Sequence, residues 1–214
     1  QSHHGRAGVP DASIAALGPR HFVQCPHGMR CPATVHDPLV RALTALLDAM
    51  FGADRVLAER TGSRRQIDEW CATHLTGHRP DIVVRGMHGP GSFTVVEVRT
   101  FDATGPTHVT SHATDRRRGG AHASLALAAT VQYGPMPPRS RLVPFVVSTT
   151  GAMGRQAAAF IAELAGRSPS SVPYALLQEA SWAAPTFASF ARCAVATAVR
   201  RAVGGYHVGY WGGL

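Results

Sequence analysis

Two short runs of β-branched residues, joined by a glycine-rich segment, constrain the fold of this chain most narrowly. Residues 82–84 read Ile-Val-Val, and residues 93–98 read Phe-Thr-Val-Val-Glu-Val. Short runs of this composition favour β-strands. Between them, residues 87–91 read Met-His-Gly-Pro-Gly, which is typical of a turn. We therefore predict a β-hairpin near the middle of the chain.

Each predicted strand of the hairpin carries one carboxylate. Asp81 opens the first strand, and Glu97 lies near the end of the second. The start of one hairpin strand lies beside the end of the other, so these side chains should be neighbours. Converging carboxylates can hold magnesium, which activates water beside a phosphodiester, and Glu59 could add a third. Alternatively, Asp81 belongs to a turn after Pro80, and Glu97 pairs with an arginine.

The remaining patterns predict an α/β fold. Asp37 is a candidate N-cap with Pro38 at the first helical position, and leucines at helical spacing follow. Residues 61–77 are polar and stay unassigned, with Trp70 as an expected anchor in the core. Tyr133 and Phe160 are expected in the core as well. The other predicted elements are strands at 55–59 and 142–147 and helices at 120–133, 153–165 and 186–203.

These elements give the order αβββαβα, a mixed sheet flanked by helices with a C-terminal helix. We expect an irregular extension over residues 1–36 and a core over residues 37–166. Residues 167–214 should hold a linker, the last helix and a tail of glycine and aromatic residues.

The charge of the chain points to an anionic partner. All 21 basic side chains are arginines, lysine is absent, and the formal net charge is +8. Such a basic surface favours nucleic acid, although GC-rich coding alone would also replace lysine with arginine. No apolar run is long enough to span a membrane. Four irregularly spaced cysteines do not resemble a disulfide framework, so we expect a reducing intracellular compartment. The mitochondrion and the nucleus both remain open. A start at Gln1 indicates a processed or truncated end.

Several stretches resemble one family of nucleases. Residues 78–84, His-Arg-Pro-Asp-Ile-Val-Val, and residues 95–99, Val-Val-Glu-Val-Arg, are similar to the motif strands of the PD-(D/E)XK restriction-like endonucleases. The likeness is greatest to the endonuclease domain that ends the reverse transcriptases of non-LTR retrotransposons. Residues 35–43 and 143–151 resemble the first helix and a late strand of that domain. The resemblance implies a restriction-endonuclease-like fold with magnesium on Asp81 and Glu97.

The departures from the family pattern imply weakened or lost catalysis. The family places a catalytic lysine beside the second carboxylate or on the following helix, as in KxxKY. Here Arg99 stands beside Glu97, and Gln132 precedes Tyr133. Arg99 can offset negative charge in the lysine's place, but it cannot serve as a base because it stays protonated. The chain thus looks like a degenerate, domesticated copy whose catalytic residues, if active, would be Asp81, Glu97, Arg99 and Glu59.

A zinc site is a second candidate. His21 and Cys25 resemble the last half of the zinc knuckle that precedes the family's endonuclease domain. Zinc needs four nitrogen or sulfur ligands, and no cysteine precedes Cys25. Cys31 and His36 could complete a different site. The alternative is a proline-rich loop whose histidines and cysteines bind nothing.

Four arginines are candidate contacts to nucleic-acid phosphates: Arg79, Arg116, Arg117 and Arg118. The last three could equally form a solvated run of charge.

Three functions follow as expectations. The first is a non-catalytic domain that binds nucleic acid or scaffolds a ribonucleoprotein with other protein subunits, for example in an organellar ribosome. The second is an active magnesium-dependent endonuclease, and the third is a structural subunit without nucleic-acid contact. An arginine paired with Glu97 or Asp81 would favour the first or the third function. Carboxylates free to share a metal would favour the second.

Overall fold

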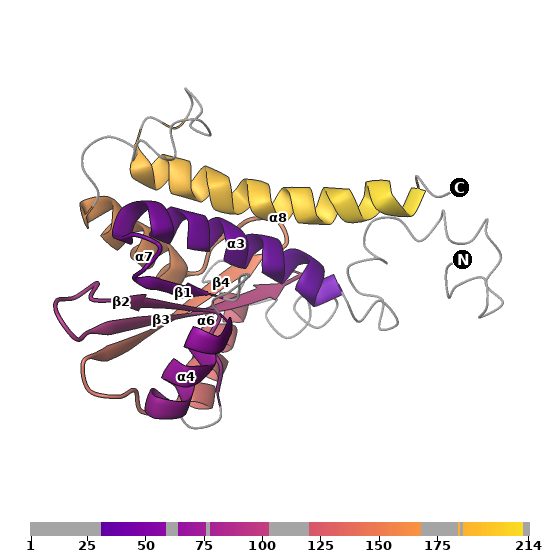
Figure 1. Cartoon of the computed structure of the whole chain (residues 1–214). Coiled ribbons are helices and arrows are strands. Elements are labelled where there is room, and N and C mark those ends of the chain that lie inside the picture. Colours follow the sequence, from indigo (N-terminus) through magenta and orange to yellow (C-terminus); the bar gives the residue numbers. More distant parts are fainter. Residues whose placement is uncertain are drawn as a thin grey trace.

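The computed structural model describes residues 31–58, 64–75, 78–102, 120–167, 184 and 186–211. Five helices and four strands lie in these ranges. In chain order they are α3 (Cys31–Phe51), β1 (Val56–Ala58), α4 (Arg64–His74), β2 (Ile82–Arg85), β3 (Phe93–Phe101), α6 (Gly120–Tyr133), β4 (Ser140–Ser148), α7 (Arg155–Arg167) and α8 (Phe187–Trp211). The α/β class, the mixed sheet and the C-terminal helix are therefore as predicted (Figure 1).

The strands form one open sheet in the order β1-β2-β3-β4. β1, β2 and β3 pair antiparallel, and β4 runs parallel to β3. The predicted hairpin is β2–β3, in which Ile82 pairs with Val96 and Arg85 with Phe93. A parallel neighbour needs a crossover, and the chain makes it through α6.

Helices cover both faces of the sheet, which explains why its strands are apolar on both sides. Alternate residues such as Ile82, Val84 and Val96 pack with α3, α7 and α8 in the larger core. Their neighbours Val83 and Val95 pack with Ile67 and Trp70 of α4 and with Tyr133 of α6 in a smaller one. Figure 1 shows α3, α7 and α8 on one side of the sheet and α4 on the other. Trp70 and Phe160 are buried, as predicted.

Three details of the predicted elements were wrong. Helix α8 continues to Trp211, so residues 204–211, predicted as a tail of glycine and aromatic residues, are helical. Helix α3 begins at Cys31, so Pro38 lies inside it, and Asp37 is not its N-cap. The predicted order αβββαβα also lacks α4, which separates β1 from β2. The sequence of α4 is mostly polar, and Ile67 and Trp70 are its two buried side chains among those described. Because a segment of this polar composition resembles a loop, its helix was not predicted.

The last helix has a defined start. The backbone N–H of Ser189 donates to Oγ1 of Thr186, and the N–H of Thr186 donates to Oγ of Ser189. This reciprocal pair satisfies donors that the first turn of a helix leaves open. Helix α8 then packs along α3 (Figure 1). Among the described helices, none combines the length and apolar character that a membrane crossing requires.

Candidate functional site

The two carboxylates singled out in the sequence are neighbours across the β2–β3 ladder. The pairing of Ile82 with Val96 brings Asp81 opposite Glu97. The backbone N–H of Val98 donates to Oδ2 of Asp81 over 2.7 Å, which holds that carboxylate against β3. Glu97 is only 7% exposed. The hairpin therefore places one buried and one half-buried carboxylate at the same position along the sheet.

Helix α3 adds a histidine to this pair. Nε2 of His36 lies 3.1 Å from Oδ1 of Asp81, and its Nδ1 lies 3.1 Å from Oδ1 of Asp37. The hydrogen bond to Asp81 is the main cause that raises the pKa of His36 to about 9, against the opposing effect of burial. At neutral pH His36 is therefore a cation that binds Asp81.

Glu97 is held by two donors. Nη2 of Arg99 lies 2.9 Å from Oε1, and the hydroxyl of Tyr133 donates to Oε2 over 2.7 Å. Burial and then the charge of Asp81 raise the pKa of Glu97, while Tyr133 and Arg99 lower it. Burial and the charge of Glu97 also raise the pKa of Tyr133, so its hydroxyl stays protonated and keeps donating.

Arg99 links this pair to helix α6. Its Nη2 also donates to Oε1 of Gln132. The ring of His78 lies against that of Tyr133, with 5.5 Å between centroids. We call the six residues that meet here the carboxylate cluster: His36, Asp81, Glu97, Arg99, Gln132 and Tyr133.

Every carboxylate oxygen of Asp81 and Glu97 thus has a protein donor. The donors are His36, the Val98 N–H, Arg99 and Tyr133. Magnesium requires near-octahedral oxygen ligands about 2.0–2.1 Å away and approaches poorly beside fixed cations. The arrangement of these donors therefore does not fit a magnesium ion between the carboxylates. Within the described part of the chain, no three or more His, Cys, Asp or Glu residues group as metal ligands.

Of the four candidate zinc ligands, only His36 has a side chain that the structure describes. His36 has both ring nitrogens on carboxylates, so its assignment as a zinc ligand is corrected. His21 and Cys25 lie outside the described residues, as does the side chain of Cys31.

Of the remaining predicted site residues, Arg79 is described and the others are not. Nε of Arg79 lies 3.3 Å from Oδ1 of Asp68, so Arg79 ties the segment before β2 to α4. Glu59 and the run Arg116, Arg117 and Arg118 lie outside the described residues.

Two members of the cluster were not predicted in their observed roles. Tyr133 was assigned to the core, and its ring does pack there while its hydroxyl binds Glu97. His36 was assigned to zinc. No local pattern in the sequence gave either contact, because His36 lies 45 positions from Asp81 and Tyr133 lies 36 positions from Glu97.

Comparisons with models of protein families, with curated proteins and with solved structures found no match to this chain.

Proposed function

We propose that this chain is a non-catalytic, nuclease-like domain that binds nucleic acid within a larger assembly. One observation carries the proposal: the two carboxylates in the position of a nuclease site are bound by the chain's own donors, two of them cationic. Glu97 pairs with an arginine, which is the arrangement expected of a site that no longer recruits metal.

The chemistry of the surrounding residues supports the loss of catalysis. Hydrolysis of a phosphodiester needs a group that orients and deprotonates water. Arg99 stays protonated at accessible pH, and Gln132 does not ionise. His36 carries a proton at neutral pH because Asp81 stabilises its charged form. The residues of the carboxylate cluster therefore offer no general base beside the carboxylates.

The same cluster has a structural use. Its hydrogen bonds and ion pairs join α3, the start of β2, β3 and α6, which come from four separate parts of the sequence. Buried charges that satisfy one another in this way stabilise a specific arrangement of elements. We infer that a former metal site now fixes the packing of the domain.

The charge of the chain supports nucleic acid as the partner. A net charge of +8 on 214 residues, carried entirely by arginine, favours binding to phosphates. A ribonucleoprotein with further protein subunits, an organellar ribosome for instance, is the setting we propose.

The test is a binding assay and a cleavage assay on the same protein. Labelled single- and double-stranded DNA and RNA would be incubated with wild type and with Asp81→Asn, in magnesium and in manganese. We expect both proteins to bind and neither to cleave. Cleavage by wild type that Asp81→Asn abolishes would establish a working endonuclease instead. The absence of binding to all four substrates would favour a purely structural subunit.

A further inference from the structure

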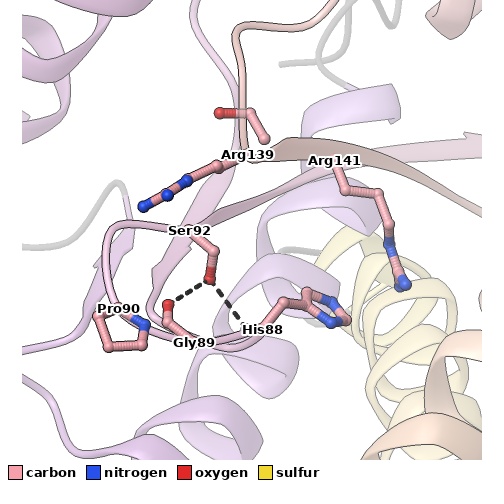
Figure 2. Close-up of a pocket in the computed structure, with 7 residues that line it drawn as sticks. His88, Gly89, Pro90, Ser92, Arg139 and Arg141 are labelled. Carbon is pink, nitrogen blue, oxygen red and sulfur yellow. Dashed lines mark hydrogen bonds between the residues drawn. The ribbon is translucent and has the colours of Figure 1, made fainter.

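A basic pocket lies at the other end of the hairpin from the carboxylate cluster. It is formed where the β2–β3 turn meets the start of β4, and its volume is about 680 Å³ (Figure 2). The residues that line it are His88, Gly89, Pro90, Ser92, Arg139, Ser140 and Arg141. The register pairs Phe93 with Ser140, so the pocket sits at the first residues of β3 and β4, before the sheet reaches Glu97.

The turn that forms one wall of the pocket is held in a single shape. Oγ of Ser92 accepts from the His88 N–H at 2.9 Å and donates to the Gly89 carbonyl at 2.8 Å (Figure 2). Gly89 and Gly91 have φ of 107° and 72°, values that L side chains rarely adopt. A wall fixed in this way loses little conformational entropy when a ligand binds.

Arg139 is held in an unusual backbone conformation at the edge of the pocket. Its φ is 60°, which makes it the one non-glycine residue with positive φ among those described. Its carbonyl accepts from the Phe93 N–H at 3.1 Å, so the pairing of β4 with β3 maintains the strain. Strained residues cluster at functional sites. Of the ion pairs between described residues, none uses Arg139, so its charge is available.

Arg141 is oriented by a shared acid on the neighbouring helix. Its Nη2 lies 2.6 Å from Glu163, which also binds Nη2 of Arg167 at 3.2 Å and lies 3.3 Å from Nε2 of His88. Arg167 further donates to the Met87 carbonyl over 2.7 Å. One carboxylate thus orients two guanidiniums. With Arg139, three arginines and one glutamate lie at or beside the pocket, so the charges of these four residues sum to a positive value. Figure 2 shows Arg141 extending toward His88 and Arg139 extending along the other side of the turn.

The two arginines of the pocket flank Ser140 in the sequence at the start of β4. Both side chains end in guanidiniums, which favour an anion because they donate charge-assisted hydrogen bonds to it.

We propose that this pocket binds backbone phosphates of a nucleic acid, with Arg139 and Arg141 as the ionic contacts. The nature of the ligand rests on the proposed function, whereas the pocket and its charge do not. The paired guanidiniums flank the turn, which suits successive phosphates along one strand better than a single small anion.

The test is fluorescence anisotropy with labelled single-stranded RNA and DNA of about 20 nucleotides over a series of salt concentrations. Arg139→Gln/Arg141→Gln is compared with Arg155→Gln/Arg192→Gln, which removes the same charge from exposed positions on α7 and α8. We expect the pocket variant to raise Kd about tenfold and to reduce the slope of log K against log salt by about 1.4, or about 0.7 for each of the two phosphate contacts on a single strand. The control pair should change Kd by less than about twofold.

The melting temperatures of the two double variants separate binding from folding. Both should melt close to wild type, because Arg139 and the control arginines are exposed. Weaker binding by a pocket variant that is as stable as the control pair cannot be attributed to unfolding.

The outcomes separate this inference from the proposed function. Tight binding by wild type that the pocket and control pairs weaken equally would overturn the pocket and leave the function standing. If no oligonucleotide binds but inorganic phosphate shifts the NMR signals of Ser140 and Arg141, the ligand is a free phosphate and the nucleic-acid proposal fails. If neither ligand binds, both proposals are overturned.

Discussion

At the residue scale, the hydrogen bonds of Glu97 decide how the candidate site behaves. A carboxylate that is only 7% exposed loses most of its hydration and must be compensated by protein donors. Arg99 supplies a charge, and Tyr133 supplies a neutral hydroxyl at 2.7 Å. The two donors come from β3 and α6, so the carboxylate also joins these elements.

The hydroxyl of Tyr133 should have a measurable effect on stability. Tyr133→Phe keeps the ring in the core and removes the donor to Glu97. We expect the free energy of unfolding to fall by about 2 kcal/mol, the typical contribution of a hydrogen bond to a charged group. Urea denaturation measures this. Thr130→Ala on the same helix is the control and should change stability by less than about 0.5 kcal/mol. Equal stability of Tyr133→Phe and wild type would show that the bond contributes nothing.

The ion pair of His36 with Asp81 predicts a particular pH dependence. The pKa of His36 is raised in the folded state, so its contribution to stability is complete below 6.5 and is lost as pH rises through about 9. Denaturation at a series of pH values should therefore show falling stability over this window. His36→Gln should flatten the curve there. A wild-type curve that matches the variant would mean that the imidazolium does not bind Asp81 in solution.

Single residues were predicted from the sequence where a local rule applied to them. Hairpin geometry alone placed Asp81 beside Glu97, because strand pairing brings a start and an end together. The contact of His36 with Asp81 joins residues 45 positions apart. No local pattern contains such a contact, which depends on where α3 crosses the sheet.

At the element scale, α8 is held close to the segment after β4. Gly151 has φ of 86°, and a Cβ there would lie 3.2 Å from Cβ of Ala196 in α8. A larger residue at this position meets both a backbone restriction and a neighbouring helix. The close approach explains how a helix from the end of the chain becomes part of the larger core.

Gly151→Ala should therefore destabilise the domain more than a comparable glycine. Gly134→Ala is the matched control, because Gly134 also has positive φ (62°) but has open space around it. We expect a loss of about 1 kcal/mol for Gly134→Ala and of about 2–3 kcal/mol for Gly151→Ala, where overpacking adds to the backbone strain. Thermal and urea denaturation of both variants measure the difference. Equal losses would mean that α8 does not pack against this segment.

Elements marked by their composition and by a stop signal were predicted well, and those without such marks were not. Residues 120–133 were predicted as a helix and form α6 over the same range. Helix α4 was missed because tertiary contacts, chiefly burial of Ile67 and Trp70 against β1 and β2, stabilise a polar sequence. The start of α3 was misplaced because the Asp37-Pro38 pair is also a common signal for a first turn.

At the scale of the whole molecule, two regions of opposite character lie along one hairpin. The carboxylate cluster neutralises its charges internally, whereas at the pocket Glu163 pairs with Arg141 and Arg167, and Arg139 makes no ion pair with a described residue. The chain as a whole carries a net charge of +8, so the cationic potential is not offset elsewhere in the sequence. The α/β class was predictable because the composition of each segment indicates a helix or a strand, and the order of these elements determines the class. The pocket was not predictable, since it combines a turn with the start of a strand about 50 residues later in the chain.

The most direct test of the central claim is the melting temperature of wild type with and without magnesium. Magnesium that binds between Asp81 and Glu97 with a Kd of about one hundredth of the added concentration would stabilise the fold by about 2.7 kcal/mol. We predict that about 10 mM magnesium chloride shifts the melting temperature no more than sodium chloride of equal ionic strength does. A larger rise that Glu97→Gln abolishes would show that the carboxylates bind metal, and would contradict the account of a site closed by its own donors.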